Sequence, residues 1–101
     1  MKALMKKVGQ DPEPIEIANK LRDLQEAVGG FIQAVPEYTA AGEIAVICDE
    51  EGRLKGYPLN CSVCGVTYCG TILIVGVSGS DFVDLDDKTA EFMKKNIHPF
   101  R

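Results

Sequence analysis

The chain has 101 residues, 46% of them hydrophobic and 26% charged, which is the profile of one globular domain over residues 1–101 rather than of a disordered chain. Its formal net charge of −4 disfavours non-specific binding to nucleic acid, and no apolar run approaches the roughly 20 residues needed to span a bilayer. Lysines interrupt the first seven residues, which therefore do not resemble a signal peptide, and we expect a cytoplasmic protein without membrane contact.

In chain order, the first third predicts two strands, a helix and a third strand, over Lys2–Val8, Ile15–Ile17, Lys20–Val28 and Phe31–Val35. Asn19 is a good N-cap for the helix, because its side chain can accept a hydrogen bond from a free backbone amide. Gly29 and Gly30 end the helix, since glycine adopts the left-handed conformation without a Cβ clash. Pro36 and residues 38–42 are expected to form the exit loop of the third strand.

The remainder predicts two further strands and a helix, over Glu43–Cys48, Thr71–Val77 and Asp86–Asn96. Residues 49–52 form a turn, and Arg53–Gly56 is a candidate short hairpin partner. The stretch Cys61–Cys69 is expected to be irregular. Thr71–Val77 is rich in β-branched residues and apolar on both faces, which predicts the centre of a sheet. Pro99 prevents the last helix from continuing.

These elements predict an α+β fold in the order β-β-α-β-β-β-α. Each helix carries one apolar stripe, and a helix with a single apolar stripe buries that stripe against a neighbouring layer. We therefore expect a mixed, mostly antiparallel sheet of about five strands, with the two helices packed on one face.

The order of several short motifs is also informative. They are the helix Asn19–Gln25, Val28–Ile32, Cys48–Gly52, Pro58–Asn60, Gly70–Gly76 and the pair Asp81-Phe82. In this order, the motifs resemble the uncharacterised family called domain of unknown function three-eight-four-six. The resemblance covers nearly the whole chain and implies a small protein of phages, plasmids or conjugative elements of mainly Gram-positive bacteria. It implies no catalytic residue. Members of that family tend to carry a polar, charged segment where this chain has Cys61, Cys64 and Cys69.

The cysteines are the sharpest local chemical feature. Cys61 and Cys64 form a C-x₂-C pattern, which can present two thiolates to a tetrahedral zinc ion, and Cys69 could add a third. Cys48 or His98 would have to supply the fourth ligand. A redox role is less favoured, because no helix follows the pattern to lower the thiol pKa. The third alternative is that these residues are reduced thiols in a cytosolic loop.

Four functional hypotheses follow. The first is a non-enzymatic accessory protein that binds another protein through the loop Tyr57, Pro58, Leu59 and Asn60, with a homodimer left open. The second is the zinc module, and no other cofactor is expected. The third is a small enzyme, which the sequence disfavours because acid, base and nucleophile do not cluster. The fourth is weak nucleic-acid binding through basic residues near the two ends, namely Lys2, Lys6, Lys7, Lys94, Lys95 and Arg101.

Overall fold

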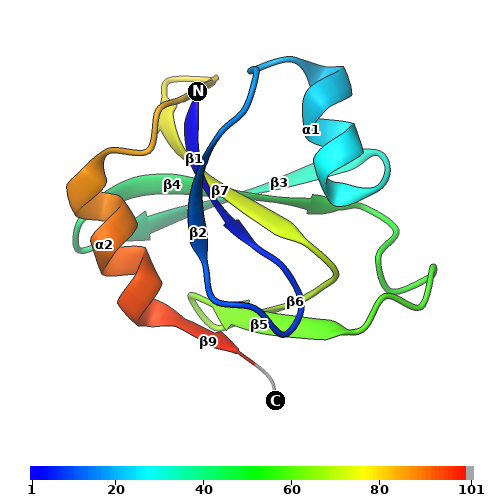
Figure 1. Cartoon of the computed structure of the whole chain (residues 1–101). Coiled ribbons are helices and arrows are strands. Elements are labelled where there is room, and N and C mark those ends of the chain that lie inside the picture. Colours follow the sequence, from blue (N-terminus) through cyan, green and yellow to red (C-terminus); the bar gives the residue numbers. More distant parts are fainter. Residues whose placement is uncertain (100–101) are drawn as a thin grey trace.

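The computed structural model describes residues 1–99, which contain nine strands and two helices (Figure 1). In chain order they are β1 (Lys2–Lys6), β2 (Glu13–Glu16), α1 (Leu21–Val28), β3 (Ile32–Thr39), β4 (Gly42–Asp49), β5 (Leu59–Val63), β6 (Val66–Cys69), β7 (Ile72–Ser78), β8 (Asp81–Val83), α2 (Asp87–Asn96) and β9 (Ile97–Pro99). The predicted α+β class and antiparallel pairing are confirmed. The strands, however, form two sheets, of six and three strands, rather than one sheet of about five.

Strand β7 lies in the centre of the larger sheet, whose order is β2-β1-β7-β4-β3, with the short β8 also paired to β7. Residues Ile72–Val75 have no exposed surface. Their side chains alternate between two core clusters, because successive residues of a strand point to opposite faces. The prediction of a buried central strand is confirmed.

The stretch Cys61–Cys69 is not irregular, as the sequence suggested, but forms the β5–β6 hairpin of the smaller sheet, ordered β6-β5-β9. A two-residue turn joins the strands, with φ of 50° at Cys64 and 80° at Gly65. Two consecutive positive φ values are typical of the type I′ turn that favours a tight hairpin. Without the usual Asn-Gly pair, Cys-Gly gave no clear hairpin signal.

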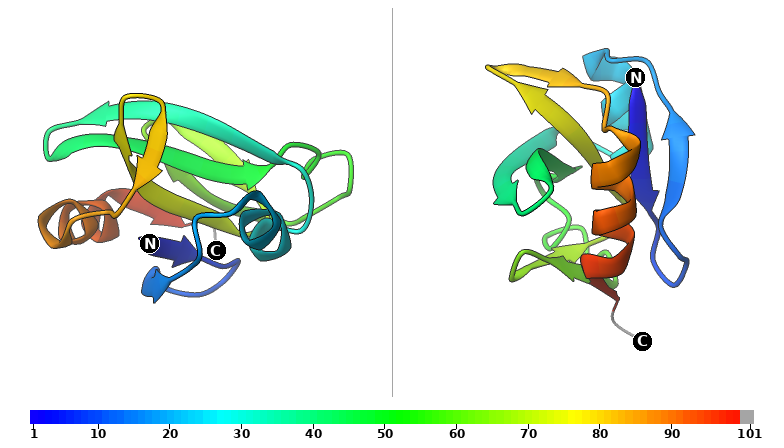
Figure 2. Two further views of the ribbon diagram at one scale, coloured as in Figure 1. Left: turned by 90° about the horizontal axis from the view of Figure 1, so that it is seen from above. Right: turned by 90° about the vertical axis from the view of Figure 1, so that its left-hand side faces the viewer.

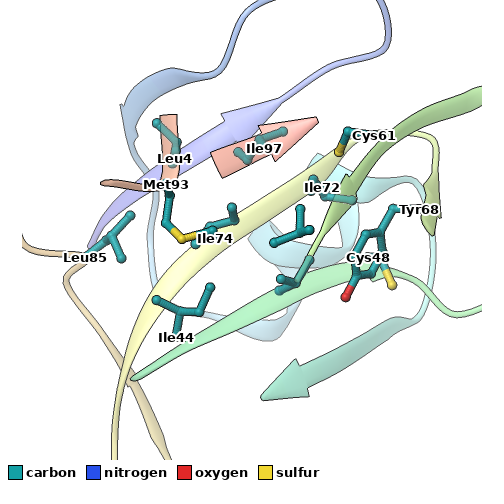
Figure 3. Packing of buried hydrophobic residues seen from close by; sticks show 12 residues of the cluster. Leu4, Ile44, Cys48, Cys61, Tyr68, Ile72, Ile74, Leu85, Met93 and Ile97 are labelled. Atoms are coloured by element: carbon teal, nitrogen blue, oxygen red, sulfur yellow. The ribbon is translucent and has the colours of Figure 1, made fainter. Parts of the chain in front are cut away.

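The two helices cover different faces of the larger sheet, so the expectation that both lie on one face is wrong. Leu24 and Val28 of α1 pack into the cluster that contains Leu73 and Val75. Met93 of α2 packs into the other cluster, together with the β5–β6 hairpin (Figure 3). Because β7 is apolar on both faces, its sequence could not assign a helix to either one. Neither helix within residues 1–99 is long and apolar enough to cross a membrane.

Three local predictions also need correction. Strand β3 continues through Pro36 to Thr39, where the sequence predicted a loop; β3 is an edge strand, and an edge position tolerates proline. Arg53–Gly56 is a turn rather than a strand. The N-cap position of α1 is Lys20, whereas the side-chain amide of Asn19 donates to the carbonyl of Phe82, 2.9 Å away.

The ends of α2 follow the sequence more closely. Asp86 caps the helix as predicted, because its side chain accepts a hydrogen bond from the Thr89 amide at 2.7 Å. The helix ends at Asn96, three residues before Pro99, and β9 follows directly. That strand pairs with β5 and so returns the end of the described chain to the smaller sheet (Figure 2, right).

A buried lysine joins the two sheets. Lys6, at the end of β1, is 1% exposed, and its ammonium donates to the Lys7 carbonyl and to Oδ1 of Asn60, both at 2.8 Å. The Asn60 amide, fully buried in β5, donates in turn to the carbonyls of Lys6 and Gly70, both at 2.7 Å. No carboxylate of the described residues forms an ion pair with Lys6. We call this arrangement the Lys6–Asn60 lock.

Removing the Asn60 side chain should destabilise the whole fold. Asn60→Leu takes one acceptor from the buried ammonium and one donor from each of two carbonyls. Each lost buried partner costs about 1–3 kcal/mol, so we expect the free energy of unfolding to fall by about 3 kcal/mol or more. Chemical denaturation measures this value. Leu59→Asn, on the exposed neighbouring residue, should change it by less than about 1 kcal/mol; equal losses in both variants would contradict the role of the lock.

Candidate functional site

The structure separates the cysteines that the sequence suggested as zinc ligands. Cys61 is fully buried in the core beside Tyr68, whereas Cys64 is exposed in the hairpin turn. Cys69 is half-buried and follows Tyr68 in β6, so its side chain points to the other face of the hairpin. Cys48 is buried in β4 (Figure 3). Within residues 1–99, no three His, Cys, Asp or Glu side chains are grouped so that they could hold a metal ion. The predicted set of Cys61, Cys64 and Cys69 is therefore not assembled in one chain.

Burial keeps several of these thiols protonated. It raises the pKa of Cys61 to about 11, against a smaller opposing effect of the nearby Lys6 ammonium. Burial and the adjacent Asp49 carboxylate raise the pKa of Cys48. Partial burial, followed by the charge of Glu37, raises the pKa of Cys64. The thiolate is the reactive form of cysteine, so none of these three has the environment of an activated nucleophile or redox centre.

Cys64 and His98 nevertheless line one groove, with a volume of about 250 Å³, between the hairpin turn and the end of α2. The pairing of β5 with β9 explains their proximity, because His98 lies opposite Ser62, two residues before Cys64. The raised pKa of Cys64 argues against a thiolate–imidazolium pair. The groove thus meets one requirement of the enzyme hypothesis, which is proximity, but not the requirement for activation.

The predicted interaction loop is divided by the structure. Asn60 is buried in the Lys6–Asn60 lock and is not available to a partner. Pro58 is exposed and Leu59 is 52% exposed. Tyr57 is half-buried and, with Pro58, lines a groove of about 350 Å³. We call this the Tyr57 groove; its other lining residues are Lys7, Val8, Glu26, Ala27, Val28, Gly29, Gly70 and Thr71.

An ion pair that sequence reasoning missed holds this loop in place. The Asp49 carboxylate, at the end of β4, accepts hydrogen bonds from the Lys55 ammonium at 2.7 Å and from the Glu51 amide at 2.9 Å. Lys55 also donates to the carbonyl of Gly29, the C-cap of α1, at 3.1 Å. We call this set the Asp49–Lys55 clasp. It fastens the turn after β4 to the end of α1.

Two features orient the Tyr57 ring: the Asp49–Lys55 clasp and the close packing of the ring against Gly70. We call this packing contact the Gly70 seat. The Lys55 ammonium lies 5.7 Å from the centre of the ring, within the range of a cation–π contact. Gly70 has φ of 75°, and a Cβ atom there would lie 2.5 Å from the ring. Any side chain at Gly70 would therefore displace Tyr57. The sequence contains little signal for this arrangement, because Asp49 falls in the predicted turn and Lys55 in the predicted hairpin partner Arg53–Gly56.

The basic residues near the two ends do not form a uniform basic patch. Lys6 is buried. Lys2 and Lys94 do line one cleft, of about 310 Å³, but acidic side chains line it with them, namely Glu16, Asp87 and Glu91. Lys94 also pairs with Glu91 at 3.0 Å. This mixed surface lacks the positive field that phosphate backbones require. Arg101 lies outside the described residues.

One buried polar atom has no partner. The Tyr68 hydroxyl, in β6, is the only buried side-chain nitrogen or oxygen atom without a hydrogen bond within residues 1–99. Burial is the main cause of the raised pKa of Tyr68. The side chain borders a cleft between β3 and β6, but the hydroxyl itself is not accessible from it.

Comparison with family models decides the relationship of the chain. The model of the family described as a domain of unknown function, DUF3846, matches residues 1–98. The chain belongs to this family. The resemblance seen in the order of the sequence motifs is thereby confirmed. Comparisons with curated proteins and with solved structures found no match.

The Asp49–Lys55 clasp should make stability depend on pH. Burial alone would raise the pKa of Asp49, but the hydrogen bonds from Lys55 and the Glu51 amide lower it. The stabilisation is therefore complete above the unfolded value of about 3.9 and is lost as the pH falls through the lower folded value. We expect Asp49→Asn to flatten the dependence of the unfolding free energy on pH in this acidic range. Glu50→Gln, an exposed neighbour, controls for net charge; parallel profiles for the wild type and Asp49→Asn would refute the clasp.

The four thiols should differ in reactivity in the order of their exposure. Cys64 is exposed, Cys69 half-buried, and Cys48 and Cys61 buried with raised pKa values. We expect a maleimide reagent to modify Cys64 first and Cys69 next under native conditions. The other two should react only after denaturant is added. Time-resolved peptide mass spectrometry measures the order, and early modification of Cys61 would show that the β5–β6 hairpin is misplaced.

Proposed function

We propose that this DUF3846 member is a small, non-enzymatic protein-binding module of mobile-element origin that acts in the cytoplasm. Its binding surface would consist of the Tyr57 groove and the adjacent exposed side chains of Pro58 and Leu59. The order of family motifs supports the origin. The proposal of this binding surface is supported by one observation: Tyr57 is held in place beside a groove with apolar walls.

Anchoring matters because binding costs conformational entropy. A side chain that is already held in place loses less freedom when a partner arrives, and tyrosine is enriched among the residues that dominate binding energy. The Lys55 ammonium and the Gly70 seat restrict the Tyr57 ring before any partner binds. Leu59, 52% exposed, offers apolar area two residues further along the chain.

The chemistry of the groove favours a peptide segment over a nucleic acid. Val8, Ala27 and Pro58 provide apolar walls, and Lys7 and Glu26 add one charge of each sign. Such a surface suits a segment with an apolar side chain flanked by polar groups. A net charge of −4 opposes a polyanionic partner. Catalysis is less well supported, because burial raises the pKa of the Cys61 and Cys64 thiols.

A photo-crosslinking residue at position 59 tests this proposal in cells of the native host. Leu59 lies at the proposed surface, whereas Leu54, 86% exposed, lines the cleft between β3 and β6 and serves as the matched control. We expect one recurrent protein to crosslink at position 59 and not at position 54. With that protein purified, Leu59→Glu should raise the dissociation constant by about 30-fold or more, as expected for a central contact worth about 2 kcal/mol.

Leu54→Glu should leave the dissociation constant within about twofold of the wild type. Thermal unfolding of both variants checks that each retains the fold. Crosslinking of the same set of proteins at both positions, or equal loss of affinity in both variants, would rule out the Tyr57 groove as the binding surface.

A further inference from the structure

We infer that Cys64 and His98 form one half of a tetrahedral Zn²⁺ site, and that a second copy of the chain supplies the other half. This inference is independent of the Tyr57 groove, because Leu59 and Val63 are the two ends of β5. The proposed binding surface includes Leu59 at the start of that strand, and Cys64 follows its end. A partner protein at one end leaves the other end free.

The fold brings these two side chains to one place from 34 positions apart. Strand β9 pairs with β5, so that His98 faces Ser62, and Cys64 follows in the hairpin turn. Both residues are exposed, and both line the groove of about 250 Å³ at the end of α2. Strand β9 is an edge of the three-stranded sheet, so no strand of the described residues pairs with its outer side.

The number of ligands that a zinc ion requires implies two copies of the chain. A structural zinc site has four ligands in tetrahedral geometry, and thiolate sulfur with imidazole nitrogen is one of its commonest combinations. No third His, Cys, Asp or Glu completes a group with this pair within residues 1–99. One chain therefore offers two ligands, and two chains related by a twofold axis offer two cysteines and two histidines. Isologous contacts of this kind are the usual geometry of homodimers.

The electrostatics of the groove favour a cation. Burial, followed by the negative charge of the Glu37 carboxylate, raises the pKa of the Cys64 thiol, and the same negative charge attracts a cation. Met93 and Asn96, in the last turn of α2, line the groove, and the carboxyl end of a helix carries partial negative charge. Lys94 and Lys95 belong to the same turn but are not among the residues that line the groove. Zinc would displace one proton from each Cys64 to solvent and bind one neutral His98 nitrogen of each copy. The four protein groups then carry two negative charges against the two positive charges of the ion.

Titration of the metal-free protein with Zn²⁺ tests the site. Sedimentation velocity, in a reducing agent that does not bind metal, should show conversion to twice the monomer mass at one zinc ion for two chains. A chelator should reverse the conversion. Replacement of Zn²⁺ by Co²⁺ should give the absorption of a tetrahedral ion with two thiolate and two imidazole ligands.

Two variants and one control identify the ligands. Cys64→Asn keeps a residue that tolerates the left-handed turn conformation, and His98→Gln keeps a polar side chain; each should abolish the zinc-dependent dimer. Cys69→Ser should dimerise like the wild type. All three should unfold at the wild-type temperature in chelator, because the changed residues contribute little to the core. A chain that stays monomeric with zinc, binds one ion per chain, dimerises in chelator, or loses dimerisation equally in Cys69→Ser would overturn the inference.

Discussion

The buried ammonium of Lys6 is the constraint on which the arrangement of the two sheets depends. A charge held at 1% exposure, with no carboxylate partner among residues 1–99, is costly unless its donors are satisfied by other groups. Here the Lys7 carbonyl and the Asn60 side chain accept its hydrogen bonds, and the Asn60 amide binds the carbonyls on either side of the junction. Strand β5 must therefore begin against the end of β1. The lock thus sets the position of the smaller sheet over one face of the larger one.

The position of the smaller sheet decides which cysteine side chains are exposed and which are buried. Once Asn60 is held in the lock, Cys61 enters the core as a small apolar residue, with its pKa raised to about 11. The hairpin then carries Cys64 to the outside at the opposite end of β5. The two cysteines of the C-x₂-C pattern, which the sequence suggested as ligands of one metal ion, therefore lie apart: Cys61 in the interior and Cys64 at the surface. Strand pairing, not cysteine spacing, brings Cys64 next to His98.

The same strand separates two surfaces with different character. Before β5, the Asp49–Lys55 clasp and the Gly70 seat hold an aromatic residue beside a groove with apolar walls. After β5, an exposed thiol and an imidazole share a groove at the end of α2. The two proposals place a partner protein at one of these surfaces and a second copy of the chain at the other. Membership in the DUF3846 family covers both ends, since the match extends over residues 1–98.

Local signals in the sequence determined the central strand β7, the Asp86 cap of α2, the glycine end of α1 and the order of motifs that marks the family. Each depends on residues close together in the chain, whose propensities act before any tertiary contact forms. The tertiary structure alone decided the face that each helix covers, the burial of Lys6 and the clasp between Asp49 and Lys55. A sheet that is apolar on both faces can pack a helix against either face. Asn60, the hydrogen-bond partner of Lys6, lies 54 residues away in the chain. Such choices depend on which strands pair, and no local pattern in a single sequence encodes that pairing.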